Sequence, residues 1–125
     1  MIVGIGLDIV ELDRIKRSWE RFGLRFAKKI LHPEELSALP ENPATYLASR
    51  FAAKEAAAKA LGTGFTGNIW MQDIYVKKNS SGRPEIVFTK GALERQRSMG
   101  AGRSQLSITH SRDNAAAVVI LETLP

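Results

Sequence analysis

Apolar and polar positions alternate along the start of the chain and predict a buried strand over residues 1–10. One side of this strand consists of branched apolar residues, namely Val3, Ile5, Leu7 and Ile9. The other side carries Gly4 and Gly6 and ends at Asp8. A strand face without side chains often marks the close approach of a ligand or of another backbone. Asp8 therefore either caps the next helix or serves a site on the bare face.

A spacing of about 3.6 residues then replaces the alternation and predicts helices. Residues 11–22 form an amphipathic helix that Gly23 ends, with an apolar face made of Leu12, Ile15, Trp19 and Phe22. A short helical piece is predicted over residues 26–31. His32-Pro33-Glu34-Glu35 has the sequence of a helix start, where we expect His32 to act as a cap rather than as a ligand. Residues 91–99 form the last predicted helix.

The longest helical pattern runs from Asn42 to Gly64 and is rich in alanine, which has the best helix propensity. Asn42 has the side chain of an N-cap, and Pro43 suits the first helical position because it lacks an N–H group. Gly62 can adopt the left-handed conformation that ends a helix. At about 1.5 Å per residue the helix would span roughly 28 Å, about the width of a small domain.

Two β-hairpins are predicted in the carboxyl-terminal half. The first joins residues 69–78 to residues 83–88 through a turn at Asn79–Gly82. The second joins residues 105–109 to residues 115–121. No repeat, low-complexity segment or long linker divides the chain, so we expect one domain over residues 1–125.

Composition narrows the class of partner. The chain of 125 residues contains no cysteine, which excludes disulfides and thiolate chemistry within it and is compatible with the cytoplasm. No apolar run approaches the ~20 residues of a membrane span, and the amino terminus does not have the pattern of a signal peptide. The net charge of +5 and pI of about 9.8 favour an acidic partner, such as nucleic acid, a phosphorylated cofactor or an acidic protein.

The predicted central helix carries an unusual arrangement of charges. On a helical wheel, Glu55 and Lys59 flank an apolar arc on one side, while Arg50 and Lys54 flank it on the other. The ordinary interpretation is that Glu55 and Lys59 form a pair that only supports the helix. The functional interpretation is that small neighbours let a ligand approach Glu55. In that case the turn at residues 62–64 offers exposed backbone donors to a phosphate beside Lys59.

Two other groups of polar residues are candidates for binding. The helix over residues 11–22 presents Arg14, Arg17 and Arg21 at a spacing that could reach an acidic partner helix, although such faces are usually only solvated. His110 and Ser111 lie at a strand end, where loops collect functional groups. One His near one Ser does not make a catalytic dyad, and structural hydrogen bonding is the commoner explanation.

Three segments taken together resemble one enzyme family. They are GIGLDIVELDRI near the amino terminus, RFAAKEAAAKALGTG in the middle and LSITHSRDNAAAVVI near the carboxyl terminus. Their order is similar to that in bacterial holo-[acyl-carrier-protein] synthases, the short single-domain group of 4′-phosphopantetheinyl transferases. The resemblance covers essentially the whole chain. One departure is His32-Pro33, which replaces a Thr- or Ser-led helix cap and affects no catalytic position.

The resemblance implies an α+β fold, with a small antiparallel sheet packed on a long central helix. It also implies a homotrimer with active sites between neighbouring subunits. The implied reaction requires Mg²⁺ and moves the 4′-phosphopantetheine group of coenzyme A onto a serine of apo-acyl carrier protein, releasing adenosine 3′,5′-bisphosphate. The expected enzyme is cytoplasmic and binds neither nucleic acid nor a membrane.

The resemblance also implies roles for individual residues. Asp8 and Glu55 take the metal-binding positions, and Lys59 takes the position of the lysine beside the pyrophosphate. The residues implied to bind coenzyme A are Arg50, Lys59, Gly62, Thr63, Gly64, His110 and Ser111. Those implied to receive the acidic carrier protein are Arg14, Arg17 and Arg21. Glu55 could also deprotonate the serine, and the sequence does not assign the two halves of the site to subunits.

The chemistry of these residues is consistent with that reaction. Two unpaired carboxylates about 4 Å apart would repel by roughly 4 kcal/mol at an effective dielectric near 20, so a cation between them is natural. The alternative is a small basic nucleic-acid-binding module, which explains the net charge but neither Asp8 on a bare strand nor Glu55 beside a glycine turn. A trimeric interaction domain without activity is a third possibility, against which Asp8, Glu55 and Lys59 argue.

Overall fold

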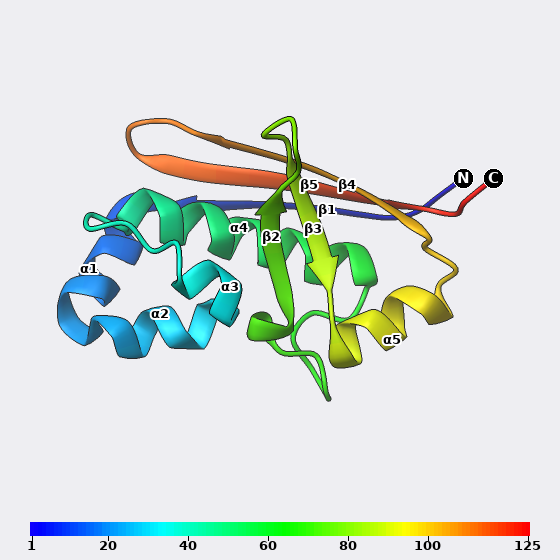
Figure 1. Ribbon diagram of the computed structural model, residues 1–125, viewed down its shortest axis with the longest axis horizontal. Helices are drawn as coiled ribbons and strands as arrows, with labels where there is room; N and C mark the ends of the chain where they lie inside the picture. The colour runs from blue at the N-terminus through cyan, green and yellow to red at the C-terminus, as the bar shows by residue number, and fades with distance from the viewer.

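The computed structural model describes residues 1–125 (Figure 1). The strands are β1 (Ile2–Glu11), β2 (Ile74–Lys78), β3 (Pro84–Phe88), β4 (Arg103–His110) and β5 (Asn114–Glu122). The helices are α1 (Leu12–Phe22), α2 (Leu24–Ile30), α3 (Pro33–Leu36), α4 (Ala44–Leu61), the short 3₁₀ helix η1 (Met71–Asp73) and α5 (Lys90–Ser98). None of these helices is both long enough and apolar enough to cross a membrane.

Helix α4 lies at the centre of the fold, between two separate antiparallel sheets (Figure 1). The larger sheet has the strand order β1-β5-β4 and packs against α4 mainly through β1 and β5. The smaller sheet is the β2-β3 hairpin, which crosses the opposite side of α4. Because it is covered on several sides, α4 buries eleven of its residues, most of them alanines. The expected α+β fold, a small antiparallel sheet on a long central helix, is confirmed.

The glycine side of β1 is the side that packs on α4. A Cβ atom added to Gly6 would collide with the carbonyl oxygen of Ala56, and one added to Gly4 would collide with that of Ala60. The strand can therefore lie directly on the helix backbone only because these two positions lack side chains. This contact aligns β1 with the second half of α4.

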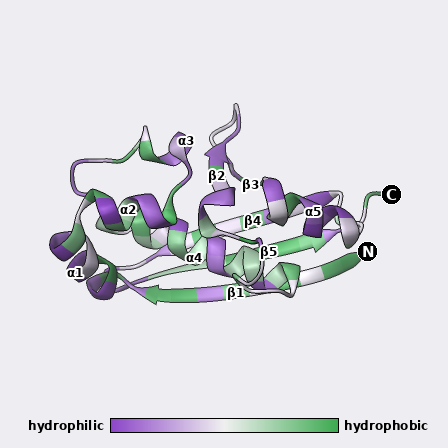
Figure 2. Ribbon diagram, turned by 90° about the horizontal axis from the view of Figure 1, so that it is seen from below, coloured by the Kyte–Doolittle hydropathy of each residue, from purple (hydrophilic) through white to green (hydrophobic).

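The opposite side of β1 faces away from α4, and the prediction of a fully buried strand was wrong in this respect. Ile5, Leu7 and Ile9 are 60%, 65% and 68% exposed in the single chain. Figure 2 shows the hydrophobic character of β1 and β5 along this layer. The bare glycine side fits against the helix, so the branched side chains must point outward. A row of exposed branched residues on an edge strand is typical of a surface covered by another chain.

The ends of α4 agree only partly with the prediction. Gly62 follows the helix in the left-handed conformation, with φ of 78°, as expected. Asn42 is not the N-cap: Pro43 occupies that position, with φ of −90° and ψ of 4°, and no side chain caps the helix. The backbone at Pro43 is already turned toward the helix, so the cap lies one residue later than predicted and Pro43 has no side-chain donor or acceptor to offer.

Most other elements lie where the periodicity places them. Gly23 ends α1 with φ of 56°, as predicted. His32 caps α3, because its Nδ1 accepts a hydrogen bond from the Glu34 amide at 3.0 Å, and Glu35 completes a capping box. The predicted strand over residues 69–78 is too long, since only residues 74–78 pair with β3. Beyond Phe88 the chain turns into α5, so residues 69–73 have no strand to pair with and form a loop and η1 instead.

Replacing Gly6 with alanine should destabilise the fold strongly, because the new methyl group would meet backbone on α4 rather than a movable side chain. We expect a loss of at least about 3 kcal/mol in the free energy of unfolding, measured by denaturant titration. Gly102→Ala is the matched control, since its methyl group would meet only the Leu124 side chain near the chain end. Equal stability of Gly6→Ala and the parent would contradict the close packing of β1 on α4.

Candidate active site

The contact between β1 and α4 brings Asp8 to Lys59. The Lys59 Nζ lies 3.2 Å from Asp8 Oδ1 and donates a hydrogen bond to the carbonyl oxygen of Leu7 at 2.9 Å. The Asp8 side chain is 17% exposed and that of Lys59 is 54% exposed, so solvent reaches the pair. Asp8 therefore lies on the bare strand face against α4 and is not the cap of α1, whose N-cap is Glu11.

Glu55 belongs to the same cluster. Its partial burial raises the pKa of the carboxyl group above the ordinary value, and the neighbouring Asp8 carboxylate raises this pKa further. The positive charges of Lys59 and Arg14 lower the pKa and offset part of that effect. Asp8, Glu55 and Lys59 thus come together within a single chain, which the sequence left open.

The glycine turn after α4 differs from its prediction. The amide groups of Gly62, Thr63 and Gly64 donate hydrogen bonds back to the carbonyl oxygens of Lys59 and Ala58, so they are not free donors. The turn does leave space, because a Cβ atom at Gly64 would meet nothing within 4 Å. The expectation of exposed backbone donors was therefore wrong, since the amides instead satisfy the carbonyls at the end of the helix.

A cation that the sequence did not single out borders this turn. The Arg95 Nε of α5 donates a hydrogen bond to the Leu61 carbonyl oxygen at 2.9 Å, and its Nη2 would lie 3.6 Å from a Cβ atom at Gly62. Arg95 is 34 residues from Leu61 in sequence, so only the fold reveals the contact.

Arg50 lies on another side of α4. At about 100° per residue it is roughly 140° from Glu55 and roughly 180° from Lys59 around the helix axis. Its guanidinium carbon lies 4.3 Å from the centre of the Tyr46 ring, and its Nε is buried without a hydrogen-bond partner. Arg50 and the Asp8 cluster therefore cannot face the same ligand from the same side of one helix.

His110 and Ser111 lie at the end of β4 and the start of the turn to β5. Both are exposed, and the Ser111 amide donates a hydrogen bond to the Asn114 carbonyl oxygen at 2.8 Å across the turn. No hydrogen bond or ion pair joins either side chain to Asp8, Glu55 or Lys59. Strand β5 lies between the strand that ends at His110 and the strand that carries Asp8.

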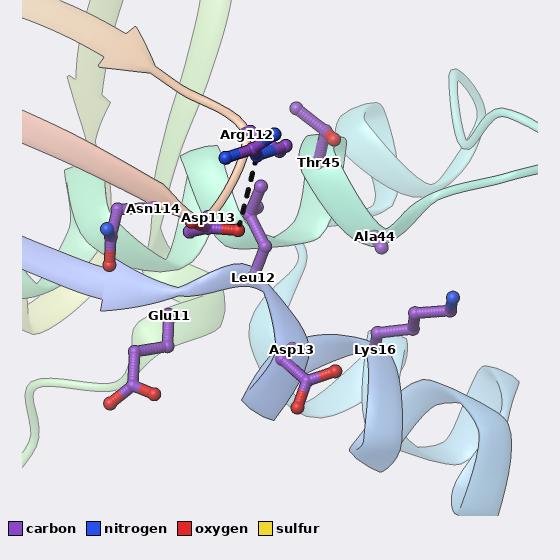
Figure 3. A pocket seen from close by; sticks show the side chains of 9 residues that line it. All are labelled: Glu11, Leu12, Asp13, Lys16, Ala44, Thr45, Arg112, Asp113 and Asn114. Atoms are coloured by element: carbon purple, nitrogen blue, oxygen red, sulfur yellow. Dashed lines mark ion pairs between the residues drawn. The ribbon is translucent and has the colours of Figure 1, made fainter.

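A hollow of about 880 Å³ lies beside that turn (Figure 3). It is bounded by the β1-α1 junction, the start of α4 and the β4-β5 turn. Arg112 and Asp113 approach within 4.0 Å at its rim, but both side chains are largely exposed, so this pair adds little stability. Asp8, Glu55 and Lys59 are not among the residues that line the hollow.

The three predicted arginines of α1 are all exposed. Arg17 Nε lies 3.8 Å from Asp13, and Arg21 packs over the Phe22 ring at 5.1 Å. Arg14 is close enough to Glu55 to lower its pKa, so this basic surface is adjacent to the cluster.

Lys54 is not on an exposed flank, as the helical wheel suggested, but is completely buried in an ion pair with Glu35 at 2.5 Å. Its seven-residue distance from both Leu47 and Leu61 places it within the apolar arc, and this spacing is the signal that could have revealed its burial. Burial lowers the pKa of Lys54, and Glu35 partly restores it.

An apolar cleft of about 540 Å³, which the sequence did not indicate, lies between α2, α4 and η1. Its lining includes Phe26, Phe51, Phe65, Trp70 and Met71.

Comparison with known proteins decides the family. Residues 4–119 match the model of the 4′-phosphopantetheinyl transferase superfamily. The chain belongs to this superfamily. Among curated relatives of this phosphopantetheinyl transferase, the holo-[acyl-carrier-protein] synthase of Nitratidesulfovibrio vulgaris is 56% identical over 124 residues, which cover 98% of the chain and 100% of the relative.

Solved structures confirm the fold of this phosphopantetheinyl transferase. The crystal structure of holo-[acyl-carrier-protein] synthase from Neisseria meningitidis has a TM-score of 0.89 at 43% identity, and the match covers 98% of this chain and 100% of that one. The holo-(acyl-carrier-protein) synthase of Bacillus anthracis, in complex with CoA (3′,5′-ADP), has a TM-score of 0.82 at 34% identity, with 99% of each chain covered. The resemblance inferred from three sequence segments is thereby confirmed.

Removing the charge of Glu55 should stabilise this phosphopantetheinyl transferase in neutral solution without divalent cations. Folding raises the pKa of the Glu55 carboxyl group, so above this pKa the ionised side chain lowers the free energy of unfolding. This loss vanishes below about pH 4.3, the ordinary pKa of a glutamate in the unfolded chain, because the group is then protonated in both states. We expect Glu55→Gln to unfold at a higher temperature than the parent at about pH 7.5 and at the same temperature near pH 4.

Thermal unfolding followed by circular dichroism across this pH range checks the prediction. Glu20→Gln, which removes the same charge at an exposed position of α1, is the control and should not give the gain in unfolding temperature expected for Glu55→Gln at neutral pH. A Glu55→Gln protein that is less stable than the parent at neutral pH would contradict the shift.

Proposed function

We propose that this phosphopantetheinyl transferase moves the 4′-phosphopantetheine group of coenzyme A onto a serine of apo-acyl carrier protein and releases adenosine 3′,5′-bisphosphate. The observation that carries the proposal is the meeting of Asp8, Glu55 and Lys59 in one site at the positions expected from the resemblance. The names of the relatives support the acyl carrier protein as acceptor. The complex of the Bacillus anthracis protein supports coenzyme A as co-substrate.

The reaction forms a bond between the serine oxygen and the β-phosphorus of coenzyme A. It breaks the bond from that phosphorus to the oxygen shared with the nucleotide phosphate. Glu55 is suited to accept the serine proton, because its raised pKa makes the carboxylate a better base than an ordinary glutamate. Lys59 supplies positive charge for the oxygen that leaves with the nucleotide, which is the main requirement of phosphoryl transfer.

The residues present fit Mg²⁺. Asp8 and Glu55 offer the carboxylate oxygens that this ion prefers, and the Asp8 charge raises the pKa of Glu55 even with Lys59 beside them. No group of three or more ligating side chains occurs in the chain, which matches an ion that keeps several waters and takes oxygens from the substrate phosphates. When bound, Mg²⁺ would supply charge neutralisation at the diphosphate.

We place the nucleotide end of coenzyme A on Arg50, His110 and Ser111 of a neighbouring subunit. Arg50 is roughly 180° from Lys59 around α4, and β5 lies between the strand that ends at His110 and the strand that carries Asp8. A symmetric homotrimer would bring the Arg50 side of one subunit to the Asp8 side of the next. The exposed apolar face of β1 (Ile5, Leu7 and Ile9) supplies a surface for such assembly.

The acidic carrier protein is proposed to dock on the basic surface of α1, which is formed by Arg14, Arg17 and Arg21. Its exposed guanidinium groups suit charge-assisted contacts with carboxylates. Arg14 is close enough to Glu55 for its charge to lower the pKa of that carboxyl group. A carrier docked there would present its serine beside the reacting groups. We propose a cytoplasmic location for the reaction, with which the absence of cysteine is compatible.

Asp8→Asn and Glu55→Ala should each reduce transfer by at least about a hundredfold, because each removes charge or proton acceptance at the reacting phosphate. The measurement is the gain of phosphopantetheine mass on an apo-acyl carrier protein incubated with coenzyme A and Mg²⁺. Circular dichroism verifies folding, and Glu20→Ala is the control. Near-normal turnover in either variant would refute the roles of these carboxylates.

Reversing charge on α1 should weaken recognition of the carrier protein. We expect Arg14→Glu combined with Arg21→Glu to raise the KM for the carrier by about tenfold or more while the KM for coenzyme A changes little. Lys77→Glu combined with Lys78→Glu makes the same change of charge on exposed positions of β2 and is the control. Equal effects on both substrates would count against a dedicated docking surface on α1.

Mixing two defective variants tests the shared site. Glu55→Ala subunits and Arg50→Ala subunits are each deficient at low coenzyme A concentration. Unfolding and refolding the two variants together should restore roughly a quarter of the sites in a closed ring, namely those in which an intact Glu55 and an intact Arg50 meet. Sedimentation checks that the mixture forms the expected trimer. If both half-sites come from the same subunit, the mixture will show no more activity than the two variants measured separately.

A further inference from the structure

The Arg50 side chain is held in place before any ligand arrives. Its guanidinium lies over the Tyr46 ring, with 4.3 Å between the guanidinium carbon and the ring centre, one helical turn earlier on α4. A cation over an aromatic face is attracted by the negative charge of that face. The buried Nε has no hydrogen-bond acceptor, so the ring is the feature that fixes this part of the side chain.

Tyr46 is itself anchored at its far end. Its hydroxyl group donates a hydrogen bond to the Glu35 backbone oxygen at 2.9 Å. The Glu35 side chain is buried and accepts hydrogen bonds from Lys54 Nζ at 2.5 Å, from the His32 amide at 3.1 Å and from the Val76 amide at 3.0 Å. The acceptor of the Tyr46 hydroxyl therefore belongs to one of the most constrained residues of the structure.

The charges around Arg50 leave it available for an anion. Lys54 and Glu35 form a pair with no net charge, and none of the four ion pairs of the chain includes Arg50. A cation that is partly desolvated, stacked and without a counterion interacts strongly with an incoming phosphate, because its position needs little adjustment on binding.

We propose that Tyr46 is a positioning residue, which holds Arg50 in the orientation that binds the nucleotide phosphate of coenzyme A. This inference rests on the function proposed above, in which Arg50 contacts that end of the substrate. Tyr46 acts on binding alone. The reacting groups Glu55 and Lys59 lie on another side of α4, so the turnover number does not depend on the ring.

The experiment compares Tyr46→Leu, which removes the ring, with Tyr46→Phe, which keeps the ring and loses only the hydroxyl group. We expect Tyr46→Leu to raise the KM for coenzyme A about fivefold and to leave kcat within twofold of the parent. Tyr46→Phe should keep the KM within about twofold, since the stacked ring remains. Partial unfolding would lower kcat without raising the KM, so this split separates positioning from stability.

Phe22→Leu is the matched control, because the Phe22 ring also lies under guanidinium groups, those of Arg21 and Arg25, but belongs to α1. It should leave the KM for coenzyme A unchanged. If Tyr46→Leu does not fold, Tyr46→Met replaces it, since methionine adapts to irregular space.

A double-mutant cycle with Arg50→Ala decides between the possible outcomes. Adding Tyr46→Leu to Arg50→Ala should raise the KM no further, and both single variants should lose most of their effect with 3′-dephospho-coenzyme A. The role of Tyr46 is refuted if Arg50→Ala raises the KM for coenzyme A but Tyr46→Leu does not. It is also refuted if Tyr46→Leu raises this KM by the same factor in the parent and in Arg50→Ala. If Arg50→Ala leaves the KM unchanged, the assignment of Arg50 in the proposed function is what fails.

Discussion

The close contact between the backbone of β1 and the backbone of α4 is the constraint on which the site depends. Gly4 and Gly6 allow the strand to lie against the carbonyl oxygens of Ala60 and Ala56. Two residues beyond Gly6, on the same side of the strand, Asp8 meets Lys59. Strand β1 and helix α4 are far apart in sequence, but the two glycines let them lie in close contact. This contact brings the charged residues of the cluster together.

The same contact explains why α4 is so rich in alanine. A helix covered by a sheet, a hairpin and neighbouring helices needs small residues on nearly every side, and α4 buries Ala48, Ala52, Ala53, Ala56 and Ala57. Only narrow strips remain partly open, one with Glu55 and Lys59 and another with Arg50 and Tyr46. The polar residues that α4 offers to a ligand are therefore confined to these strips, which lie on different sides of the helix.

Local signals in the sequence were sufficient for the order and type of the elements, because alternation, helical spacing, glycines and caps each act over a few residues. The same signals drew attention to the bare strand and to Glu55 with Lys59. They did not show which side of β1 would meet the helix, since that depends on packing between distant segments.

Features that depend on tertiary contacts were missed for the same reason. The partner of Lys54 is Glu35, 19 residues away, and the partner of the Arg95 side chain is Leu61, 34 residues away. The amides of residues 62–64 seemed free because the sequence does not show that the helix end uses them. The resemblance supplied His110 and Ser111, which no hydrogen bond or ion pair joins to Asp8, Glu55 or Lys59 in the chain.

The β2-β3 hairpin has a consequence for motion. Neither of its strands pairs with a strand of the larger sheet, and its outer edge is tied to the body by the bond from the Val76 amide to Glu35. Its inward side chains Ile74, Val76, Ile86 and Phe88 are buried in the core, so side-chain packing rather than a shared strand ladder holds the hairpin on the body. Because β5 is paired on both sides, the hairpin amides should exchange with solvent deuterium sooner than those of β5. Since Glu35 bonds both to this hairpin and to Tyr46, the hairpin and the Tyr46–Arg50 pair share one support.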